Sequence, residues 1–445
     1  MPDSPPGPPS RYFGQHFLAL SRDPLAFLTR LKTEYGDIAQ IRLGGQPMVA
    51  LSHPDQIRAL LVTDHRLFAK GRGLERAKRM LGQGLLTSEG EFHLRQRRLV
   101  QPAFHRERIQ GYGMVMADAT ARHLARWQDG GEVDIHREMM ALTLTIVART
   151  LFSADVSHEV DELGQAISAS VDLFRQSLLP FGQWLEYLPL GPGARFRATR
   201  RRLDATIQRF IDEHRAGGDQ GDLLSMLILA QDDEAHGERM TDLQLRDESM
   251  TLFLAGHETT ANAASWGLYL LSRHPEIAAR VRQEVAGVVG EGAPGPDDLP
   301  ALPYTTMVVA EVMRLYPPAW TIGRRALQDW DVAGYRIVKG TLILASPWVT
   351  HRDPRWWPDP LRFDPLRFTE SAKATRPKFA YFPFGGGPRI CVGEQFAWME
   401  GVLIVASVLQ RFEFEPVNPA ATVVPAPSIT LRPRGGLPMR VRRLT

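Results

Sequence analysis

The chain reads Phe-Gly-Gly-Gly-Pro-Arg-Ile-Cys-Val-Gly from Phe384 to Gly393, and this stretch holds its only cysteine, Cys391. Glycine permits backbone torsions that other residues avoid, so three consecutive glycines predict a tight loop. Such a loop can bring backbone N–H groups up to a sulfur and begin a helix behind it. The pattern therefore predicts a held thiolate, although a lone cysteine without this context is more often a small buried apolar residue.

A second unusual stretch, Ala-Gly-His-Glu-Thr-Thr from Ala255 to Thr260, lies within the largely apolar segment 250–271. Gly and Thr weaken a helix interior, and a carboxylate there must be solvated or paired. Function is the usual reason for such a cluster in the middle of a helix. The alternative is an ordinary buried helix that carries a polar ridge.

A third feature is the pair Glu311 and Arg314, three residues apart on one predicted helix and followed by Pro317 and Pro318. An isolated pair at this spacing is usually a surface salt bridge that contributes only a few tenths of a kcal/mol. By itself the pair therefore indicates no function.

Together these stretches resemble the signatures of the cytochrome P-450 family, the haem-thiolate monooxygenases. The family's haem-binding signature is Phe, two spacers, Gly, spacer, Arg, spacer, Cys, spacer, Gly, and all five fixed positions match between Phe384 and Gly393. The resemblance implies haem b, iron protoporphyrin IX, with Cys391 as its axial thiolate and metal ligand. It also implies that Arg389 pairs with a haem propionate and that Phe384 packs beside the sulfur. A thiolate ligand favours O–O cleavage.

The stretch from Ala255 to Thr259 resembles the family's oxygen-activating helix. The resemblance implies that Gly256 lets the helix open over the iron. Glu258 and Thr259 would then relay protons to dioxygen. His257 is not part of the relay pattern, and we expect it to be a packed or hydrogen-bonded helix residue.

Glu311 and Arg314 resemble the family's Glu-x-x-Arg helix. Its partner is the arginine of a downstream Phe-x-Pro-x-Arg-Phe segment, which here is Arg367 within residues 363–368. We therefore interpret Glu311, Arg314 and Arg367 as a structural ion network with no catalytic step.

Residues 90–105 resemble the family's C helix, on which a side chain and an arginine one turn later face the haem edge. His93 and Arg97 have that spacing, although many relatives carry Trp at the first position. Arg324 resembles the strand arginine that also reaches a propionate. The neighbouring Arg325 leaves that assignment open by one residue, and arginine suits bidentate pairing with a carboxylate.

The composition is that of a folded globular protein, with 44% hydrophobic and 23% charged residues. The 53 Lys and Arg residues exceed the 50 Asp and Glu residues by only 3, which is too small a bias to predict nucleic-acid binding. One cysteine excludes an intrachain disulfide. No stretch approaches the ~18 apolar residues of a membrane-spanning helix, and the N-terminus lacks a signal-peptide pattern. We therefore expect a soluble cytoplasmic protein without a membrane anchor.

Hydrophobic spacing predicts a mainly α chain with small β-sheets, an α+β class that agrees with the cytochrome P-450 fold. We expect a proline-rich lead at 1–20 and a single large haem domain at 21–445. The predicted elements are a helix in 21–35, an antiparallel sheet in 37–52, mostly helices from 91 to about 274, loops and short strands beyond 317, a last helix from about 396, and a hairpin in 429–441 around two glycines.

The resemblance implies a monooxygenase that inserts one atom of O2 into a hydrophobic small molecule by hydroxylation or epoxidation. Electrons would come from separate proteins, a ferredoxin and its reductase or a flavodoxin, and we expect a monomer. The alternatives are a peroxide-using peroxygenase or isomerase and a non-enzymatic haem gas sensor. Fatty acids, terpenes, steroids and polyketides all remain possible substrates. The candidate pocket residues are Leu85, Leu86, Phe174, Phe181, Trp184, Leu254, Trp320 and Ile322.

Overall fold

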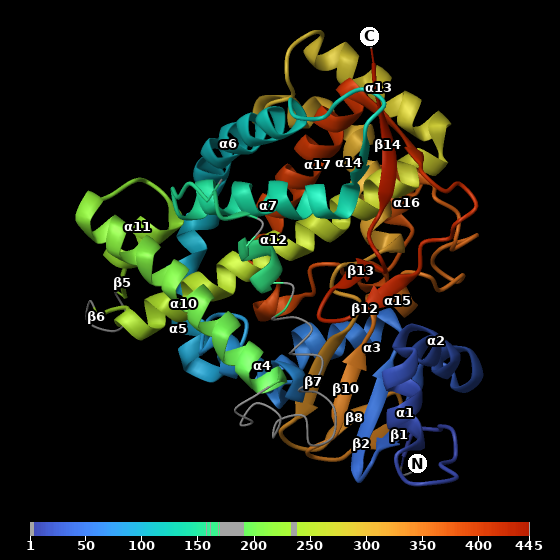
Figure 1. Ribbon diagram of the computed structural model, residues 1–445. Coiled ribbons are helices and arrows are strands. Elements are labelled where there is room, and N and C mark those ends of the chain that lie inside the picture. The colour runs from blue at the N-terminus through green and yellow to red at the C-terminus, as the bar shows by residue number, and fades with distance from the viewer. Residues whose placement is uncertain are drawn as a thin grey trace. The chain divides into compact units, whose positions relative to one another are not determined.

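The computed structural model describes residues 4–156, 158–160, 162–167, 169, 191–232 and 238–444. The chain divides into two units, each built from segments that lie far apart in the sequence (Figure 1). Unit 1 comprises Met1–Glu75 and Ala310–Cys391, and unit 2 comprises Arg76–Val309 and Val392–Thr445. We call residues 384–393 the thiolate loop. Its cysteine, Cys391, is the last residue of unit 1, and the helix that follows the loop belongs to unit 2.

Unit 1 holds short helices and two sheets. Its elements are α1 (Gln15–Arg22), α2 (Pro24–Tyr35), β1 (Ile38–Leu43), β2 (Gln46–Leu51), α3 (Pro54–Arg58), η1 (Ala59–Thr63), η2 (His65–Leu67), β3 (Phe68–Lys70), β7 (Ile322–Ala326), β8 (Trp330–Val332), β9 (Tyr335–Ile337), β10 (Leu342–Ala345), α15 (Pro347–Thr350), η6 (Pro365–Phe368), α16 (Glu370–Ala374), η7 (Lys378–Ala380) and η8 (Gly387–Arg389). Two helices, α4 (Arg72–Leu81) and α14 (Pro303–Leu315), cross the boundary between the units.

Unit 2 is mostly helical. Its elements are α5 (Gly90–Val100), η3 (Gln101–Phe104), α6 (Arg106–Leu124), β4 (Glu132–Asp134), α7 (Ile135–Leu151), α10 (Pro192–Gly217), α11 (Leu223–Leu229), β5 (Gln231–Asp232), β6 (Glu238–Arg239), α12 (Asp242–Arg273), α13 (Pro275–Val289), η5 (Pro296–Ala301), α17 (Glu394–Arg411), β11 (Phe412–Pro416), β12 (Pro425–Pro427), β13 (Leu431–Pro433) and β14 (Pro438–Arg443). The expected class, mainly α with small sheets, is confirmed.

The alternating apolar residues of 37–52 form the predicted antiparallel pair, β1 and β2, with Ile38 opposite Leu51. The apolar run 342–345 becomes β10, which lies parallel to β2 and extends the sheet to the order β1-β2-β10-β7-β3. Alternation places one face of these strands against a buried apolar cluster that includes Val49 and Ile343. The carbonyl of Pro6 accepts from Gln40 N–H at 2.8 Å, so the proline-rich lead is tied to the edge strand.

The 32-residue helix α12 is the central element of unit 2 and packs against α7, α10 and α17. It begins at a capping box in which Thr241 and Gln244 exchange side-chain and backbone hydrogen bonds. It ends at Arg273, with His274 as its C-cap, because Pro275 follows and proline disfavours helical torsions in the residue before it. Within the described chain, no helix is both long and apolar enough to cross a membrane.

The prediction of a hairpin across residues 429–441 is wrong. β13 pairs with β12, whereas β14 pairs with β11 and β4 in a separate sheet. Gly435 and Gly436 have φ angles of +80° and +83°, and they connect the two sheets instead of closing a hairpin. Alternation shows that a strand buries one face, but it does not select the partner strand.

Candidate active site

The glycines of the thiolate loop are required by close contacts within unit 1. Gly385 and Gly387 have φ angles of +78° and +67°, which favour glycine. A Cβ at Gly387 would collide with the carbonyl of Leu61, and one at Gly386 would lie 2.6 Å from the Phe379 ring. The loop therefore packs closely against η1 and η7.

This loop presents the thiol outward. Cys391 N–H donates to the carbonyl of Phe384 at 3.0 Å, and the Cys391 residue is exposed although cysteine is usually buried. Among the described residues, no cluster of three or more His, Cys, Asp or Glu side chains could hold a metal ion. A single accessible thiolate suits the axial position of a porphyrin iron, whose ring supplies the other ligands. The residues present therefore fit the haem.

Helix α12 has an accessible strip in its otherwise buried middle. Ala255 is exposed, while Gly256, Thr259 and Ala263 are half-buried; these residues follow helical spacing. The Thr259 hydroxyl donates to the Ala255 carbonyl at 2.7 Å. We call these four residues the open strip. Part of the stretch that the sequence singled out is therefore accessible, whereas His257, Glu258 and Thr260 are buried.

The helix runs unbroken through Gly256. A Cβ at Gly256 would lie 3.0 Å from Cγ2 of Val147, which allows little room for a side chain. Close packing of α12 against α7 is the physical reason for glycine in this structure.

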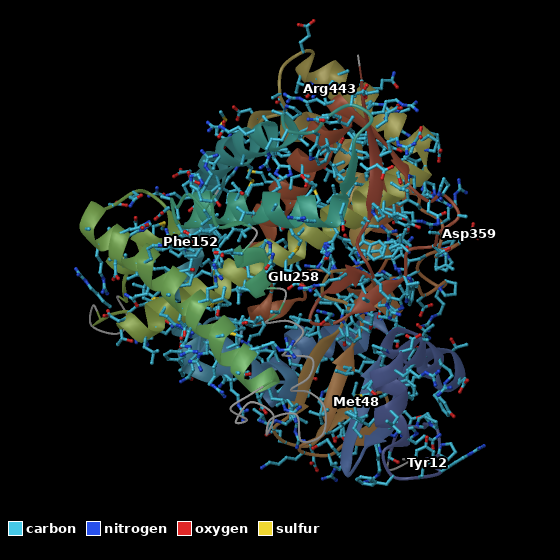
Figure 2. All side chains as sticks on the ribbon, viewed as in Figure 1. Tyr12, Met48, Phe152, Glu258, Asp359 and Arg443 are labelled. Atoms are coloured by element: carbon cyan, nitrogen blue, oxygen red, sulfur yellow. The ribbon has the colours of Figure 1, made fainter. Side chains whose placement is uncertain are left out.

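Glu258 is held by the C-terminal segment. Its Oε1 accepts from Arg432 Nε at 2.6 Å and from the Thr430 hydroxyl. Glu258, which is labelled in Figure 2, is buried and belongs to unit 2. The neighbouring His257 is fully buried and donates from Nε2 to the Met140 carbonyl at 2.9 Å, as expected for a packed residue. Burial lowers the pKa of His257 to about 4, so it is neutral at physiological pH.

The candidate haem-edge residues fall in both units. His93 is buried on α5, with the half-buried Arg97 one turn later. In unit 1, Arg324 and Arg325 are successive residues of β7 and point to opposite faces. Arg325 forms a 2.8 Å ion pair with Glu75, which favours Arg324 as the haem-edge candidate.

The predicted ion network forms within unit 1. Arg314 binds both carboxyl oxygens of Glu311 at 2.6 and 2.8 Å, and Arg367 Nε lies 3.6 Å from Glu311 Oε1. Neither Glu311 nor Arg314 has any exposed side-chain surface. Burial raises the pKa of Glu311, while Arg314 opposes this shift.

This network also supports the thiolate loop through a residue that the sequence did not indicate. Arg314 Nη1 donates to the carbonyl of His351 at 2.8 Å, and His351 Nε2 accepts from Phe382 N–H at 3.0 Å. Burial and the Arg314 charge lower the pKa of His351 well below its usual value, so its ring is neutral. Because Nε2 accepts from Phe382 N–H, the single ring proton lies on Nδ1. Phe382 in turn accepts from Gly385 N–H at 3.0 Å.

Glu400 on α17 is another residue that motif reasoning missed. It is fully buried beside α12, and within the described chain neither carboxyl oxygen makes a well-formed hydrogen bond. Burial raises the pKa of Glu400 to about 8, and the Thr260 hydroxyl offsets only part of this shift. Glu400 is therefore largely protonated at neutral pH.

We expect Glu400 to make the free energy of unfolding fall as pH rises from about 5 to 8. In this window the folded chain holds a proton that the unfolded chain has released. A rise in the Glu400 pKa from 4.5 to about 8 corresponds to a decrease of about 5 kcal/mol in the free energy of unfolding across this pH window. Urea unfolding of Glu400→Gln should lose this slope, whereas the surface variant Glu415→Gln should keep it. An equal slope in both variants would contradict the assignment.

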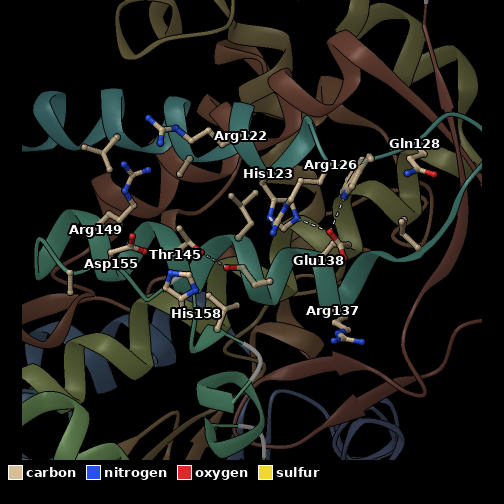
Figure 3. Close-up of a pocket in the computed structure, with 18 of the residues that line it drawn as sticks. Arg122, His123, Arg126, Gln128, Arg137, Glu138, Thr145, Arg149, Asp155 and His158 are labelled. Carbon is tan, nitrogen blue, oxygen red and sulfur yellow. Dashed lines mark hydrogen bonds and ion pairs between the residues drawn. The ribbon is translucent and has the colours of Figure 1, made fainter.

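Unit 2 also has a hollow of about 1200 Å³ lined by α6, β4 and α7 (Figure 3). Arg122, Arg126, Arg137 and Arg149 line it together with acidic residues. His123 Nε2 donates to Glu138 at 2.8 Å (Figure 3). Such a charged lining does not suit a hydrophobic substrate. Of the predicted pocket residues, Phe174, Phe181 and Trp184 lie outside the described residues.

The chain that carries the thiolate loop and the open strip is similar to known proteins over nearly its whole length. The family model described as Cytochrome P450 matches residues 5–437. The chain is a cytochrome P450. The resemblance inferred from the motifs is thereby confirmed across nearly the whole sequence.

Three relatives of this cytochrome P450 come from Streptomyces. Cyclooctatin synthase of Streptomyces melanosporofaciens is 40% identical and matches 94% of this chain and 91% of its own. Cyclooctat-9-en-7-ol 5-monooxygenase of the same species is 37% identical, with 90% and 87% covered. Pentalenene oxygenase of Streptomyces avermitilis is 38% identical, with 94% and 92% covered.

The solved structure of a cyanobacterial cytochrome P450, CYP120A1 with bound retinoic acid, matches with a TM-score of 0.88. It is 26% identical, and the match covers 99% of this chain and 100% of the other. This cytochrome P450 is accordingly a haem-thiolate monooxygenase, which inserts one atom of O2 into a hydrophobic small molecule.

Proposed function

We propose that this cytochrome P450 oxygenates a cyclic terpenoid and uses haem b as its cofactor. The observation that carries the proposal is the 40% identity to cyclooctatin synthase over 94% of the chain. Two further relatives are named for cyclooctat-9-en-7-ol and pentalenene, and both names denote unsaturated compounds. Hydroxylation and epoxidation remain the two expected reaction types.

Cys391 would supply the thiolate to the haem, Phe384 would pack beside the sulfur, and Arg389 and Arg324 would pair with propionates. His93, Arg97 and Gly393 complete the proposed set, and Gly393 is the N-cap of α17. When bound, the haem supplies the redox chemistry by which dioxygen is reduced and cleaved.

Side chains of α12 would deliver the protons that this reaction consumes. Monooxygenation consumes O2, two electrons and two protons, and it releases one water molecule. We assign proton delivery to Glu258 and Thr259. Ala255, one turn before Thr259, is exposed and has a small side chain, so the Thr259 hydroxyl stays accessible. Gly256 lets α12 pack closely against Val147 of α7.

Electrons would come from a separate ferredoxin and its reductase, or from a flavodoxin. The three Streptomyces relatives are matched over at least 87% of their own lengths, so little of each lies outside the shared fold. A monomer in the cytoplasm remains the sequence prediction.

The proposed function can be tested by titrating the holoprotein with matched panels of cyclic terpenes, fatty acids and steroids. We expect cyclic terpene hydrocarbons and alcohols to shift the haem absorption band. These compounds should then be oxygenated only when NADPH, ferredoxin, its reductase and O2 are all present. Oxygenation of fatty acids alone would overturn the terpenoid assignment, and equal turnover with peroxide alone would support a peroxygenase.

We expect Thr259→Ala to keep haem and ligand binding while lowering the product formed per NADPH consumed. Without the hydroxyl, the site loses an ordered proton donor, and electrons are diverted to peroxide. Thr259→Ser, which retains the hydroxyl, is the matched control and should stay close to wild type. If Thr259→Ala is fully coupled, Thr259 has no part in proton delivery.

A further inference from the structure

One face of α12 is fastened to the C-terminal ribbon, which we define as β12 and β13 with the residues between them. Glu258, Asn262 and Trp266 are spaced four residues apart and share this face. Glu258 binds Thr430 and Arg432, Asn262 Nδ2 donates to Thr430 Oγ1 at 3.0 Å, and Trp266 Nε1 donates to the Leu431 carbonyl at 2.9 Å. Each α12 side chain thus contacts a ribbon residue.

The two carboxyl oxygens of Glu258 have different surroundings. Both hydrogen bonds, from Arg432 Nε and from the Thr430 hydroxyl, end on Oε1. The Glu258 side chain retains 6% of its exposure, and that of Arg432 retains 15%. Oε1 is therefore anchored, whereas neither of these two hydrogen bonds ends on Oε2.

The polar groups around this ion pair are incompletely satisfied. Among the described residues, Arg432 Nη2, Asn262 Oδ1 and His257 Nδ1 are buried without a hydrogen-bond partner. Buried polar atoms of this kind usually bind ordered water. The charges of Glu258 and Arg432 also act on the pKa of His136 on α7: Glu258 raises it and Arg432 lowers it. The site therefore has the polar groups that a water chain to Oε2 requires.

We propose that Arg432 and Thr430 are positioning residues for proton delivery: they anchor Oε1 of Glu258 so that Oε2 exchanges protons beside the open strip. The inference rests on the proposed role of Glu258 and Thr259. Glu258 accepts a proton at Oε2 from solvent through a chain of water molecules, so that no hydroxide is left in the site. It then passes a proton toward Thr259 and becomes a carboxylate again, while Oε1 stays bound to Arg432 and Thr430 throughout. The C-terminal ribbon thereby takes part in oxygen activation through a residue 174 positions away.

The test compares holoprotein variants that alter this contact. Arg432→Gln removes the charge, Arg432→Lys keeps it, and Thr430→Val removes the second anchor. Arg434→Gln is the matched control because Arg434 is an exposed arginine of the same segment. Melting temperature and the carbon monoxide spectrum identify any variant that fails to fold or to hold haem.

We expect Arg432→Gln and Thr430→Val to lower the product formed per NADPH about tenfold, less than the 100-fold or more that a complete general acid contributes. The solvent isotope effect on NADPH consumption should rise, while ligand affinity stays unchanged. Arg432→Lys should recover most of the coupling. Because Arg432 acts through Glu258, adding Arg432→Gln to Glu258→Gln should cause little further loss.

Two results would overturn the inference. One is that Arg432→Gln behaves like Arg434→Gln, and the other is that its effect adds fully to that of Glu258→Gln. If wild type oxygenates no compound in the panel, the terpenoid proposal fails. The solvent isotope effect on NADPH consumption, which needs no identified product, then still decides the role of Arg432.

Discussion

Cys391→Ala should abolish the thiolate-type carbon monoxide spectrum, most haem retention and turnover. The chain has no second cysteine that could replace the ligand. We expect turnover to fall by roughly a thousandfold or more, equivalent to about 4 kcal/mol of activation free energy. The measurements are the reduced carbon monoxide difference spectrum, the haem content of the purified protein and the rate of product formation.

The neighbouring variant Val392→Ala is the control for this experiment because it alters the same loop and leaves the thiol in place. It should retain the thiolate-type spectrum and most of the haem. A Cys391→Ala protein that keeps the thiolate-type spectrum would show that the assignment of the axial ligand is wrong.

Arg314→Met should lower the free energy of unfolding by about 3–5 kcal/mol, because it removes the arginine that binds both oxygens of the buried Glu311 carboxylate and leaves only the more distant Arg367. The variant also removes donors from the carbonyls of His351 and Pro360, which lie 2.8 and 2.7 Å from Nη1. Since His351 holds Phe382 next to the thiolate loop, the variant should retain less haem as well.

Urea unfolding followed by tryptophan fluorescence measures this loss, with haem content as the second readout. Arg336→Met is the matched control, because Arg336 pairs with Asp329 on the surface and its side chain is 68% exposed. It should change the free energy of unfolding by no more than about 0.5–1 kcal/mol. Equal losses of free energy of unfolding in the two variants would show that the buried Glu311–Arg314 pair stabilises the fold no more than the surface pair does.

The thiolate loop and the ion network could be predicted from residues that are close together in the sequence. Three glycines beside a single cysteine allow few backbone arrangements, and the loop has the positive φ angles that glycine favours. Glu311 and Arg314 lie one turn apart on α14, so their contact follows from helix geometry once burial excludes water. The apolar runs that form β1, β2 and β10 were likewise readable.

The pairing of the short C-terminal strands could not be predicted from the sequence. Residues 429–441 alternate in the way that a hairpin does, yet β13 and β14 belong to different sheets. A period of two specifies which face of a strand is buried, and any neighbouring strand with a complementary edge satisfies it.

Cys391 as the candidate thiolate ligand, the polar stretch of α12 and the mainly helical class could all be predicted, because each prediction depends on residues that lie close together along the chain. The contacts of Arg432 and Thr430 with Glu258, and the link from the ion network through His351 to the thiolate loop, appear only in the folded chain. Only the fold likewise buried Glu400 and raised its pKa to about 8. These effects depend on burial and on contacts between distant segments, which local spacing does not encode.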